Sequence, residues 1–478
     1  MPHSPRFRPA RSHQDLGPAF YDPVRAAEFP RHILRFRNDS WAARTGLAAL
    51  TDAEWIDHFG RFVPLPGSLP EPLALRYHGH QFRNYNPDLG DGRGFLFAQL
   101  HDLADGRLLD LGTKGSGQTP WSRFGDGRLT LKGGVREILA TEMLEALGVD
   151  TSKSFSLIET GEDLVRGDEP SPTRSSVLVR LSHSHIRIGS FQRLARLEET
   201  DNVARLRDHV IRHYLPAAWH DDEAARTLAF LEDICRRVAR TGAQWMLAGF
   251  VHGVLNTDNI NVTGESFDYG PWRFAPVLDP GFTAAYFDQT GLYAFGRQPD
   301  TLLWNLTRLA ECLLPFANKA ALEAALGAFQ PALQEAFALR MAQRLGLAPE
   351  SGDADRDLAR RVWTFLEKSR MPFERFFFDW HGGESSAARA LRGEAADYYG
   401  RPDFEPVREA LSGRRAAPDA RLDHPYFGEA APCTMLIEEV EAIWAPIAER
   451  DDWSVFEAKI AAIRRMREAY GAGPAGIT

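Results

Sequence analysis

The sequence predicts an α+β protein in which strands dominate before about residue 190 and helices dominate after it. Short apolar runs separated by turn residues fill the earlier part, whereas the later part carries long segments with apolar side chains at helical spacing. A strand-rich portion followed by a helix-rich portion, with polar loops between them, indicates two lobes with a cleft between them. A chain of 478 residues is long enough to bury such a core.

The earlier part contains a hairpin, because two apolar runs, 95–100 and 108–111, flank the turn dipeptide Asp105-Gly106. Apolar side chains then recur at helical spacing over residues 135–147, where the following Gly148 is typical of a helix stop. Two further strands are expected, at residues 154–160 and 175–181.

The later part begins with a long helix, which an apolar stripe predicts over residues 223–247. An irregular polar segment follows at 251–268, then a helix near 301–313. Residues 320–470 have an almost entirely helical pattern, broken by a loop-like stretch around 413–432. The chain therefore divides into an arm packed on the core at 1–60, a strand-rich lobe at 61–188, a helical lobe at 189–345 and a helical extension at 346–478.

The composition excludes several classes of protein. Acidic residues outnumber basic ones by 65 to 56, which opposes broad binding to nucleic acid or anionic membranes. The three cysteines have no CxxC spacing, so we expect a reducing compartment and no disulfide framework. Neither a secretory h-region nor an apolar run of about 18 residues occurs. We therefore expect a cytoplasmic protein that binds neither nucleic acid nor membranes. We also expect a monomer, although the composition does not bear on the oligomeric state.

The strongest chemical motif is His252-Gly-Val-Leu-Asn-Thr-Asp-Asn259, followed nine residues later by Asp268-Tyr-Gly270. Protein kinases carry His-Arg-Asp-x-x-x-x-Asn in their catalytic loop and Asp-Phe-Gly in their second metal motif. Asn and Asp side chains are hard oxygen ligands, which suit Mg²⁺ held between protein and phosphate oxygens. An Asn- and Asp-rich loop after a long helix can also be simple turn chemistry. The paired Asp-Tyr-Gly favours the metal-binding interpretation.

The kinase comparison leaves the position of the catalytic base vacant. Val254 falls where a kinase has its aspartate, and an aliphatic side chain cannot accept a proton. Asp258, one residue before Asn259, is the nearest carboxylate that can do so.

A lysine and a glutamate in the earlier part complete the kinase-like set. Lys114 ends the second hairpin strand and could reach phosphates, and Glu137 in the next helix could hold it in place. First-turn helix stabilisation explains Glu137 equally well when it is taken alone. Glu142 and Glu145 lie further along the same helix, and we expect them on its solvent face.

Glycines and arginines supply further candidates for a nucleotide site. The loop Gly90-Asp-Gly-Arg-Gly94 could bring backbone N–H groups close to phosphates, with a charge-assisted contact from Arg93. It lacks both the ending of a P-loop and the spacing of a dinucleotide fingerprint. Arg180 and Arg187 lie at and after the strand that would link the lobes. Either could be an ordinary ion-pair arginine, but both would suit a triphosphate placed differently from that of a kinase.

Together these blocks resemble the selenoprotein O family, also called YdiU. The resemblance covers roughly residues 60–315. Its early blocks are Arg76-Tyr-x-Gly-His-Gln-Phe82, Asn86-Pro-x-Leu-Gly-Asp-Gly-Arg-Gly94, Lys114-Gly-x-Gly-x-Thr-Pro-x-Ser-Arg123, Gly125-Asp-Gly-Arg128 and Arg136-Glu137. Its later blocks are the two kinase-like motifs, Asp279-Pro-Gly-Phe282 and Trp304-Asn-Leu306.

The resemblance implies a protein-kinase-like fold with a strand-rich N-lobe, a helical C-lobe and additional C-terminal helices. It implies that ATP binds in a flipped orientation with Mg²⁺, or with Mn²⁺, and that AMP passes to Ser, Thr or Tyr hydroxyls of protein substrates. It makes Asp258 the base, Asn259 and Asp268 the metal ligands, and Lys114–Glu137 an ion pair. The nucleotide-binding residues that it implies are Gly90, Gly92, Arg93, Lys114, Asp126, Gly127, Arg180, Arg187 and Asp268.

Two departures from the family pattern affect these expectations. Gly133-Gly134 stands where the family tends to have serines, which would loosen the start of the helix that carries Glu137. The last 130 or so residues match poorly, and the ending Gly471–Thr478 has no cysteine or selenocysteine of the kind typical of the family. Redox control through a terminal cysteine is therefore not expected.

Three functions remain open from the sequence. The first is a protein adenylyltransferase, which would act as a uridylyltransferase if UTP replaced ATP. The second is a phosphotransferase with ATP in the usual kinase orientation, which Val254 opposes. The third is a non-catalytic nucleotide-binding pseudokinase, which the presence of Lys114, Asn259 and Asp268 opposes.

Overall fold

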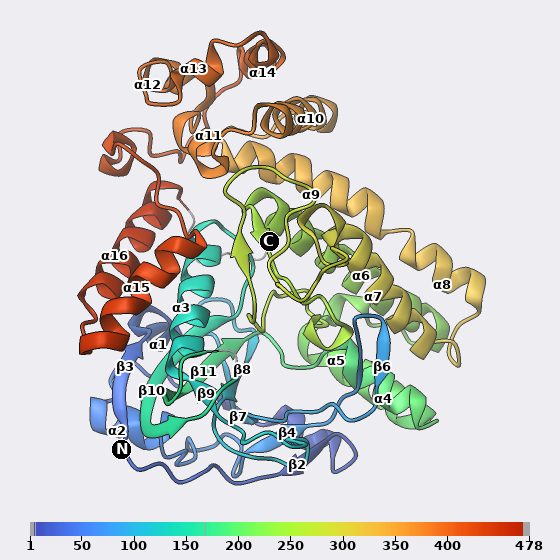
Figure 1. The fold of residues 1–478 in the computed structure, drawn as a ribbon. Coiled ribbons are helices and arrows are strands. Elements are labelled where there is room, and N and C mark those ends of the chain that lie inside the picture. Colours follow the sequence, from blue (N-terminus) through green and yellow to red (C-terminus); the bar gives the residue numbers. More distant parts are fainter. Residues whose placement is uncertain (1–3, 5, 168, 472–478) are drawn as a thin grey trace.

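Nine strands from the first half of the chain form one antiparallel sheet in the computed structural model, which describes residue 4 and residues 6–167 and 169–471 (Figure 1). The sheet runs in the order β2-β4-β7-β8-β11-β10-β3, while β1 pairs with β7 and β9 pairs with β11. The strands are β1 Pro9–Ala10, β2 Tyr21–Pro23, β3 Ile33–Arg37, β4 Leu73–Leu75, β7 Leu96–His101, β8 Leu108–Lys114, β9 Leu129–Thr130, β10 Lys153–Leu164 and β11 Thr173–Ser182.

The hairpin predicted from Asp105-Gly106 is confirmed as β7 and β8. Gly106 has a φ of 78°, a conformation that glycine adopts without the steric cost other residues incur. Leu100 lies opposite Leu109 in the register of the pair. β8 runs from the apolar run 108–111 to Lys114, its predicted last residue, and all of its residues are buried. Lys114 is therefore the last residue of a fully buried strand.

The first sixty residues share this sheet with the residues that follow them. They contribute β1, β2 and β3, together with helices α1 (Asp39–Thr45) and α2 (Asp52–Phe59). Thr51 begins α2 with a capping box to Glu54. The aromatic side chains of these helices pack with residues of β7, β8, β10 and β11 in a common core.

Helix α3 (Leu131–Ala146) packs against β10 and β11 and begins four residues earlier than predicted. Thr130 caps it by accepting a hydrogen bond from the backbone N–H of Gly133. The two glycines therefore lie inside the first turn and do not precede the helix. A Cβ on Gly134 would lie 2.4 Å from Leu157 Cδ1, so this glycine lets the helix approach the sheet closely.

The second half of the chain is mainly helical, and α6 has the bounds that were predicted. Two short pairs of strands, β5 Gly79–Gln81 with β6 Asn84–Asn86 and β12 Phe250–Val251 with β13 Arg273–Phe274, stand apart from the main sheet. The helices are α4 Ile188–Arg196, α5 Thr200–Tyr214, α6 Glu223–Leu247, α7 Gln298–Cys312, α8 Lys319–Leu326, α9 Phe329–Arg344, α10 Gly352–Ser369, α11 Phe373–Asp379, α12 Ala387–Ala390, α13 Ala396–Tyr399, α14 Glu405–Leu411, α15 Ile437–Arg450 and α16 Ser454–Ala469.

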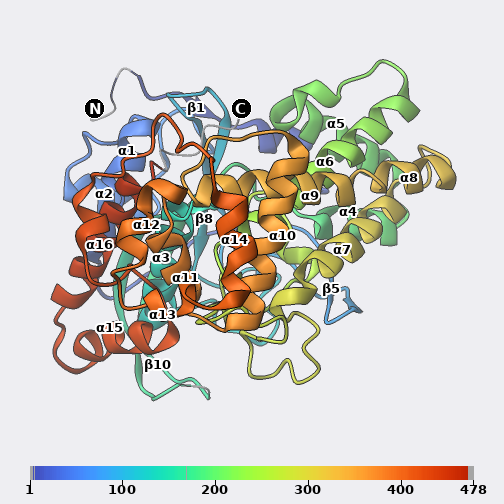
Figure 2. The ribbon, with the colours of Figure 1, turned by 90° about the horizontal axis from the view of Figure 1, so that it is seen from above.

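The C-terminal helices return to the first half of the chain. Figures 1 and 2 show α15 and α16 beside α3, and α16 packs along that helix. Helices α10 to α14 surround a second core that contains Phe376, Phe377 and Trp380. The loop predicted around 413–432 holds only the short 3₁₀ turn Pro425–Gly428 among its described elements.

Among the helices that the structure describes, none is both long enough and apolar enough to cross a membrane. Residues 472–478, among which no cysteine occurs, lie outside the described residues. The observed architecture is thus a mixed α and β one, with a strand-rich sheet from the first half and helices from the second.

Candidate active site

A compact ionic cluster joins the two halves of the chain at the end of β8. The ammonium group of Lys114 donates to Glu137 Oε2 at 2.6 Å and to Asp268 Oδ1 at 3.0 Å. Arg180 Nη1 lies 3.1 Å from the same Asp268 oxygen and 3.4 Å from Glu137 Oε1. Lys114, Glu137 and Arg180 are buried, so each charge is paired with another rather than with water.

Asp268 is the member of this cluster that faces outward, with 26% of its side chain exposed. Burial alone would raise its pKa, but the positive charges of Lys114, Arg180, Arg187 and Arg93 hold that pKa well below the usual range. The residue is therefore a carboxylate at neutral pH. Its φ of 66° is uncommon for a residue other than glycine, and such strain is often found at functional positions.

Arg187 extends the cationic region from the start of α4. Its guanidinium lies 4.1 Å from the ring centre of Tyr77 and 5.0 Å from that of Phe267. It donates to the backbone oxygen of Asp258 at 3.2 Å and lies 3.5 Å from Asp91 Oδ1. Arg180 and Arg187, which the sequence places at and after the strand that would link the lobes, are thus both buried beside the Lys114 cluster.

The segment 252–259 forms a loop after β12 with few free polar groups. The ring of His252 is buried, and its Nε2 lies 3.0 Å from the backbone oxygen of Phe267. Asn259 donates its amide to the backbone oxygen of Val254 at 2.8 Å, which leaves its carbonyl oxygen as the atom available to a ligand. This contact fixes Val254 and Asn259 within one turn of the loop.

Asp258 is the one carboxylate of this loop, and it is buried. Its Oδ1 has no hydrogen-bond partner among the described residues. Burial raises the pKa of Asp258 to about 7, although the positive charge of Arg187 opposes the rise. A buried polar atom without a partner is uncommon and marks a place where a further group can bind.

The donors suit a divalent cation that takes only two ligands from the protein. Both cationic contacts of Asp268 go to Oδ1, so neither uses Oδ2. Asn259 offers its carbonyl oxygen in the same way. No group of three or more His, Cys, Asp or Glu residues suited to a metal occurs among the residues that the structure describes. Two oxygen ligands, completed by phosphate oxygens and water, form a typical Mg²⁺ site.

The glycine loop packs closely under the segment that follows Lys114. A Cβ on Gly90 would lie 2.4 Å from Trp121 Cγ, and a Cβ on Gly92 would lie 2.8 Å from the backbone oxygen of Trp121. These glycines therefore allow a close approach within the protein, whatever they offer to a ligand. Arg93 is exposed, and its charge lowers the pKa of Asp268. The loop is thus close to the ionic cluster.

Asp126 and Gly127 are held by different contacts. Asp126 forms an ion pair with Arg166 at 2.8 Å and does not join the cluster around Lys114. Gly127 has a φ of 70°, and a Cβ there would lie 2.2 Å from the carbonyl carbon of Gly117. The pair therefore shapes the segment 115–128 in this structure, and its contact with a nucleotide stays a prediction.

A cavity of about 1150 Å³ lies elsewhere, between α6 and α9. Arg236, Arg240 and Arg340 are among its lining residues, but so are Glu232 and Asp150. This mixed lining offers no excess of positive charge, and we assign the cavity no part in the chemistry of the ionic cluster.

The comparisons with known proteins decide the family. The family model described as protein adenylyltransferase SelO matches residues 6–464. The chain belongs to this family. Relatives named protein nucleotidyltransferase YdiU agree: that of Synechocystis sp. is 45% identical over 459 residues, covering 93% of this chain and 95% of the relative. Those of Gloeobacter violaceus and Synechococcus elongatus are each 44% identical, covering 94% and 96% of this chain and 93% and 94% of the relative.

Membership of the SelO family confirms the resemblance and the expectation of a nucleotidyltransferase. It corrects the extent of the resemblance, which was placed at residues 60–315, because the match runs from 6 to 464. The first sixty residues form three strands of the sheet, and α15 and α16 pack on α3, so both ends belong to the same packed unit. Those ends lack chemical motifs, so no short sequence signal marks them as part of the family.

The position predicted for two glutamates of this SelO family member is wrong. Glu142 and Glu145 were expected on the solvent face of α3, but both are buried. Glu142 accepts from Arg464 at 3.2 Å, and Glu145 pairs with Arg467 at 2.9 Å. Trp41 Nε1 also donates to Glu145 at 3.0 Å. Helix α16 covers this face, and nothing near α3 in the sequence reveals that.

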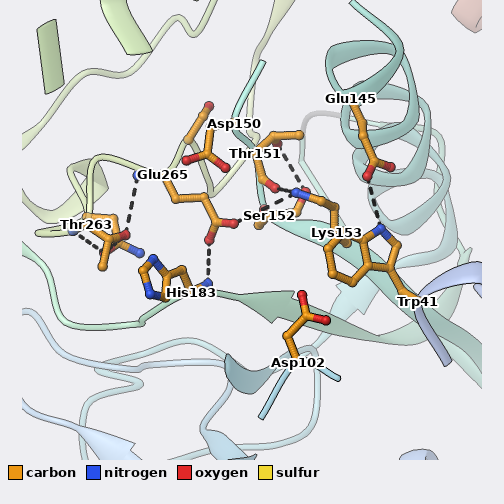
Figure 3. Close-up of polar contacts among 12 residues, drawn as sticks. Trp41, Asp102, Glu145, Asp150, Thr151, Ser152, Lys153, His183, Thr263 and Glu265 are labelled. Atoms are coloured by element: carbon orange, nitrogen blue, oxygen red, sulfur yellow. Dashed lines mark hydrogen bonds and ion pairs between the residues drawn. The ribbon is translucent and has the colours of Figure 1, made fainter. Parts of the chain in front are cut away.

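A second buried ionic pair, which no sequence motif indicates, joins Lys153 to Glu265 in this SelO family member (Figure 3). Glu265, three residues before Asp268, accepts a hydrogen bond from the backbone N–H of His183 at 2.7 Å. Lys153 Nζ lies 3.9 Å from Glu265 and also donates to the backbone oxygen of Thr151. Figure 3 shows the carboxylate of Glu265 between His183 and Lys153. The pair links β10 to the segment that carries Asp268.

Replacing Glu265 by glutamine is expected to change how stability depends on pH. Burial raises the pKa of Glu265 from 4.5 to about 7, although Lys153 opposes the rise. Because the folded-state pKa is raised, the stabilising effect of the proton is complete below pH 4.5 and is lost as pH rises through 7. Glu265→Gln has no such loss, so its stability relative to wild type should rise by about 1–3 kcal/mol over that window. Thermal unfolding at pH 5 and pH 8 measures the difference.

The exposed Glu449→Gln serves as the control for this experiment, because that side chain is 70% accessible and should give the same difference at both pH values. A Glu265→Gln difference that stayed constant from pH 5 to pH 8 would show that the carboxyl does not titrate in this window.

Proposed function

We propose that this chain transfers AMP from ATP to Ser, Thr or Tyr hydroxyls of proteins and releases pyrophosphate, with the two halves of the chain acting as the lobes of a protein-kinase-like fold. The observation that carries the proposal is the pair of buried arginines, Arg180 and Arg187, at the connection between the halves. Two buried guanidinium groups beside Lys114 and Asp268 favour phosphates there, and they add to the single lysine that a kinase uses for this purpose. The family match supports the same activity.

The position of the arginines also supports a flipped orientation of ATP. Phosphates held near Arg180 and Arg187 would lie at the inner end of the site, next to Lys114 and Asp268. The γ-phosphate would then face inward and the α-phosphate would face the acceptor. AMP transfer requires that arrangement, because pyrophosphate must leave on the side opposite the attacking hydroxyl.

The chain's own residues can carry the reaction in one displacement. Asp258 takes the proton of the acceptor hydroxyl, and the hydroxyl oxygen forms a bond to the α-phosphorus. The bond between the α-phosphorus and the oxygen bridging to the β-phosphate breaks, and the electron pair leaves with pyrophosphate. Lys114, Arg180 and Arg93 stabilise the charge on that leaving group. Val254 leaves the kinase base position without a proton acceptor, which supports this use of Asp258.

Asn259 and Asp268 would hold the divalent cation, Mg²⁺ or alternatively Mn²⁺. When bound, the cation would neutralise part of the negative charge on the phosphate oxygens. Gly90, Gly92, Asp126 and Gly127 complete the proposed nucleotide site by resemblance to the family. Their roles rest on that resemblance and on the nearness of the loop to Asp268.

We further propose that the chain acts in the cytoplasm as a monomer. Its three cysteines are all free, and burial raises the pKa of Cys235 and Cys312 to about 12. Thiols in that state stay protonated and unreactive, as in many proteins of reducing compartments. The partners that this proposal names are ATP and protein substrates with accessible hydroxyls.

The position of a radioactive label tests the proposed activity. Purified protein and Mg²⁺ are incubated with ATP labelled at either the α- or the γ-phosphate, and protein-bound label is measured. We expect label from the α-phosphate alone. Label from the γ-phosphate alone would establish a phosphotransferase, and absence of label from both would favour a non-catalytic nucleotide-binding protein.

A further inference from the structure

The hairpin β5–β6 is fixed to the loop that carries Asp258. The backbone N–H of His80 donates to Thr257 Oγ1 at 2.7 Å, and that of Phe82 donates to Asn256 Oδ1 at 3.0 Å. A Cβ on Gly79 would lie 2.9 Å from Asp258 Oδ1, so this strand borders the carboxylate directly. Figure 1 shows the hairpin, in blue, beside the helices of the second half. Its tip is therefore held at the side of the site where an acceptor hydroxyl must arrive.

The tip of this hairpin is strained and carries two large side chains. Gln81 pairs with Asn84, which leaves Phe82 and Arg83 as a two-residue turn. Both have positive φ, 48° and 64°, the conformation for which hairpins usually select Asn-Gly. A non-glycine residue in this region costs about 1–2 kcal/mol. The sequence keeps Phe and Arg where glycine would be easier, which indicates that these side chains have a use.

An exposed aromatic surface continues from Phe82. The ring of Phe82 lies 5.8 Å from that of Phe287, which in turn lies 5.2 Å from that of Tyr286. The residues Tyr286 and Phe287 are 85% and 47% exposed, far more than most large hydrophobic side chains of this chain. Tyr293 anchors the same loop, because its hydroxyl donates to Asn256 at 2.6 Å. The aromatic surface is thus fixed to the Asp258 loop at two points.

Two arginines without carboxylate partners flank the same site. Arg83 is exposed and lies over Trp304, 5.5 Å from its ring centre, and forms no ion pair with a described carboxylate. Arg123, on the segment 115–128, is exposed in the same way, and its neighbour Ser122 fixes this segment to the glycine loop by donating to the backbone oxygen of Gly92 at 2.5 Å. Phe124, which follows Arg123, is fully exposed. Each of the two sides of the site therefore presents one arginine without a described carboxylate partner and at least one exposed aromatic ring.

We propose that this surface, formed by Phe82, Arg83, Arg123, Phe124, Tyr286 and Phe287, binds the protein substrate as an extended segment that carries acidic residues beside its acceptor hydroxyl and an apolar side chain further along. The inference rests on the proposed AMP transfer and names the class of acceptor. Charge complementarity argues for an acidic occupant, because neither Arg83 nor Arg123 forms an ion pair with a carboxylate of the described residues. The exposed rings provide apolar area for the accompanying side chain.

Peptides of matched sequence test the proposal. Each carries one serine, flanked by acidic, neutral or basic residues, and initial rates of label transfer from α-labelled ATP are measured. Acidic flanks should give a kcat/KM about 3- to 10-fold above neutral flanks and further above basic ones, mainly through KM. The preference should weaken as ionic strength rises, since surface charges are screened.

A charge-reversal variant identifies the residue responsible. Arg83→Glu should remove or reverse the preference for acidic flanks and leave ATP affinity unchanged. Phe287→Ala should raise KM for all peptides, and Phe287→Leu should restore it. Arg356→Glu, which reverses an exposed charge on α10, is the matched control and should behave like wild type.

The outcomes separate this inference from the proposed function. Absence of α-label from every acceptor, including the chain itself, would overturn AMP transfer as a whole. Equal labelling of acidic, neutral and basic peptides, an unchanged preference in Arg83→Glu, or labelling of the chain itself with no peptide labelled would overturn the proposed surface while AMP transfer stands.

Discussion

Replacing Asp268 by alanine should lower AMP transfer by about 10³-fold or more. The carboxylate is one of the two proposed metal ligands, and removing one preorganised electrostatic group from a phosphoryl-transfer site costs this much. The substitution also leaves Lys114 and Arg180 without the partner that lies 3.0 Å and 3.1 Å from them. Initial rates with α-labelled ATP measure the loss.

The Asp268→Ala protein should still bind ATP, because Lys114 and Arg180 remain to hold its phosphates. Asp357→Ala is a suitable control, since that carboxylate lies on α10 and is 40% exposed. Thermal unfolding of both variants shows whether the fold is retained. Transfer within tenfold of wild type by a folded Asp268→Ala protein would mean that the metal assignment is wrong.

Replacing Asp258 by asparagine is expected to lower kcat by about 10²- to 10⁴-fold, the usual contribution of a positioned general base. Asparagine keeps the shape of the side chain but cannot accept the hydroxyl proton. Arg187 binds the backbone oxygen at this position, so the loop should keep its conformation. Single-turnover rates with saturating ATP separate this loss from any change in binding.

The affinity for ATP and the melting temperature should both stay close to wild type in Asp258→Asn. A variant that kept its kcat would require another proton acceptor, and no other carboxylate occurs between His252 and Asn259. A variant that lost ATP binding instead would assign Asp258 to the nucleotide site.

The local part of the site could be predicted from sequence, because each signal lies within a short stretch. The turn Asp105-Gly106 predicted the hairpin that ends in Lys114, and the helical spacing after it predicted the helix that carries Glu137. The ion pair between them spans 23 residues and was proposed correctly. Spacing alone also showed that Val254 could not act as a base.

The parts that sequence could not predict depend on contacts between distant segments. Lys153 and Glu265 are 112 positions apart, and no periodicity links a strand residue to one before Asp268. The strained turn at Phe82 and Arg83 could not be predicted either, because these residues are not typical of a two-residue turn. The sequence suggests that Gly134 loosens the start of its helix, yet in the structure the lack of a side chain at Gly134 allows close packing on Leu157.

Helix α16 has a consequence for the order in which the protein can mature. Arg464 and Arg467 supply the positive charges for Glu142 and Glu145, which were synthesised more than 300 residues earlier. A buried carboxylate without its partner costs about 3–5 kcal/mol. During translation, Glu142 and Glu145, which lie on the helix that carries Glu137, therefore have no arginine partner until almost the whole chain has been made. We expect nascent chains to acquire a firm nucleotide site only when translation is nearly complete.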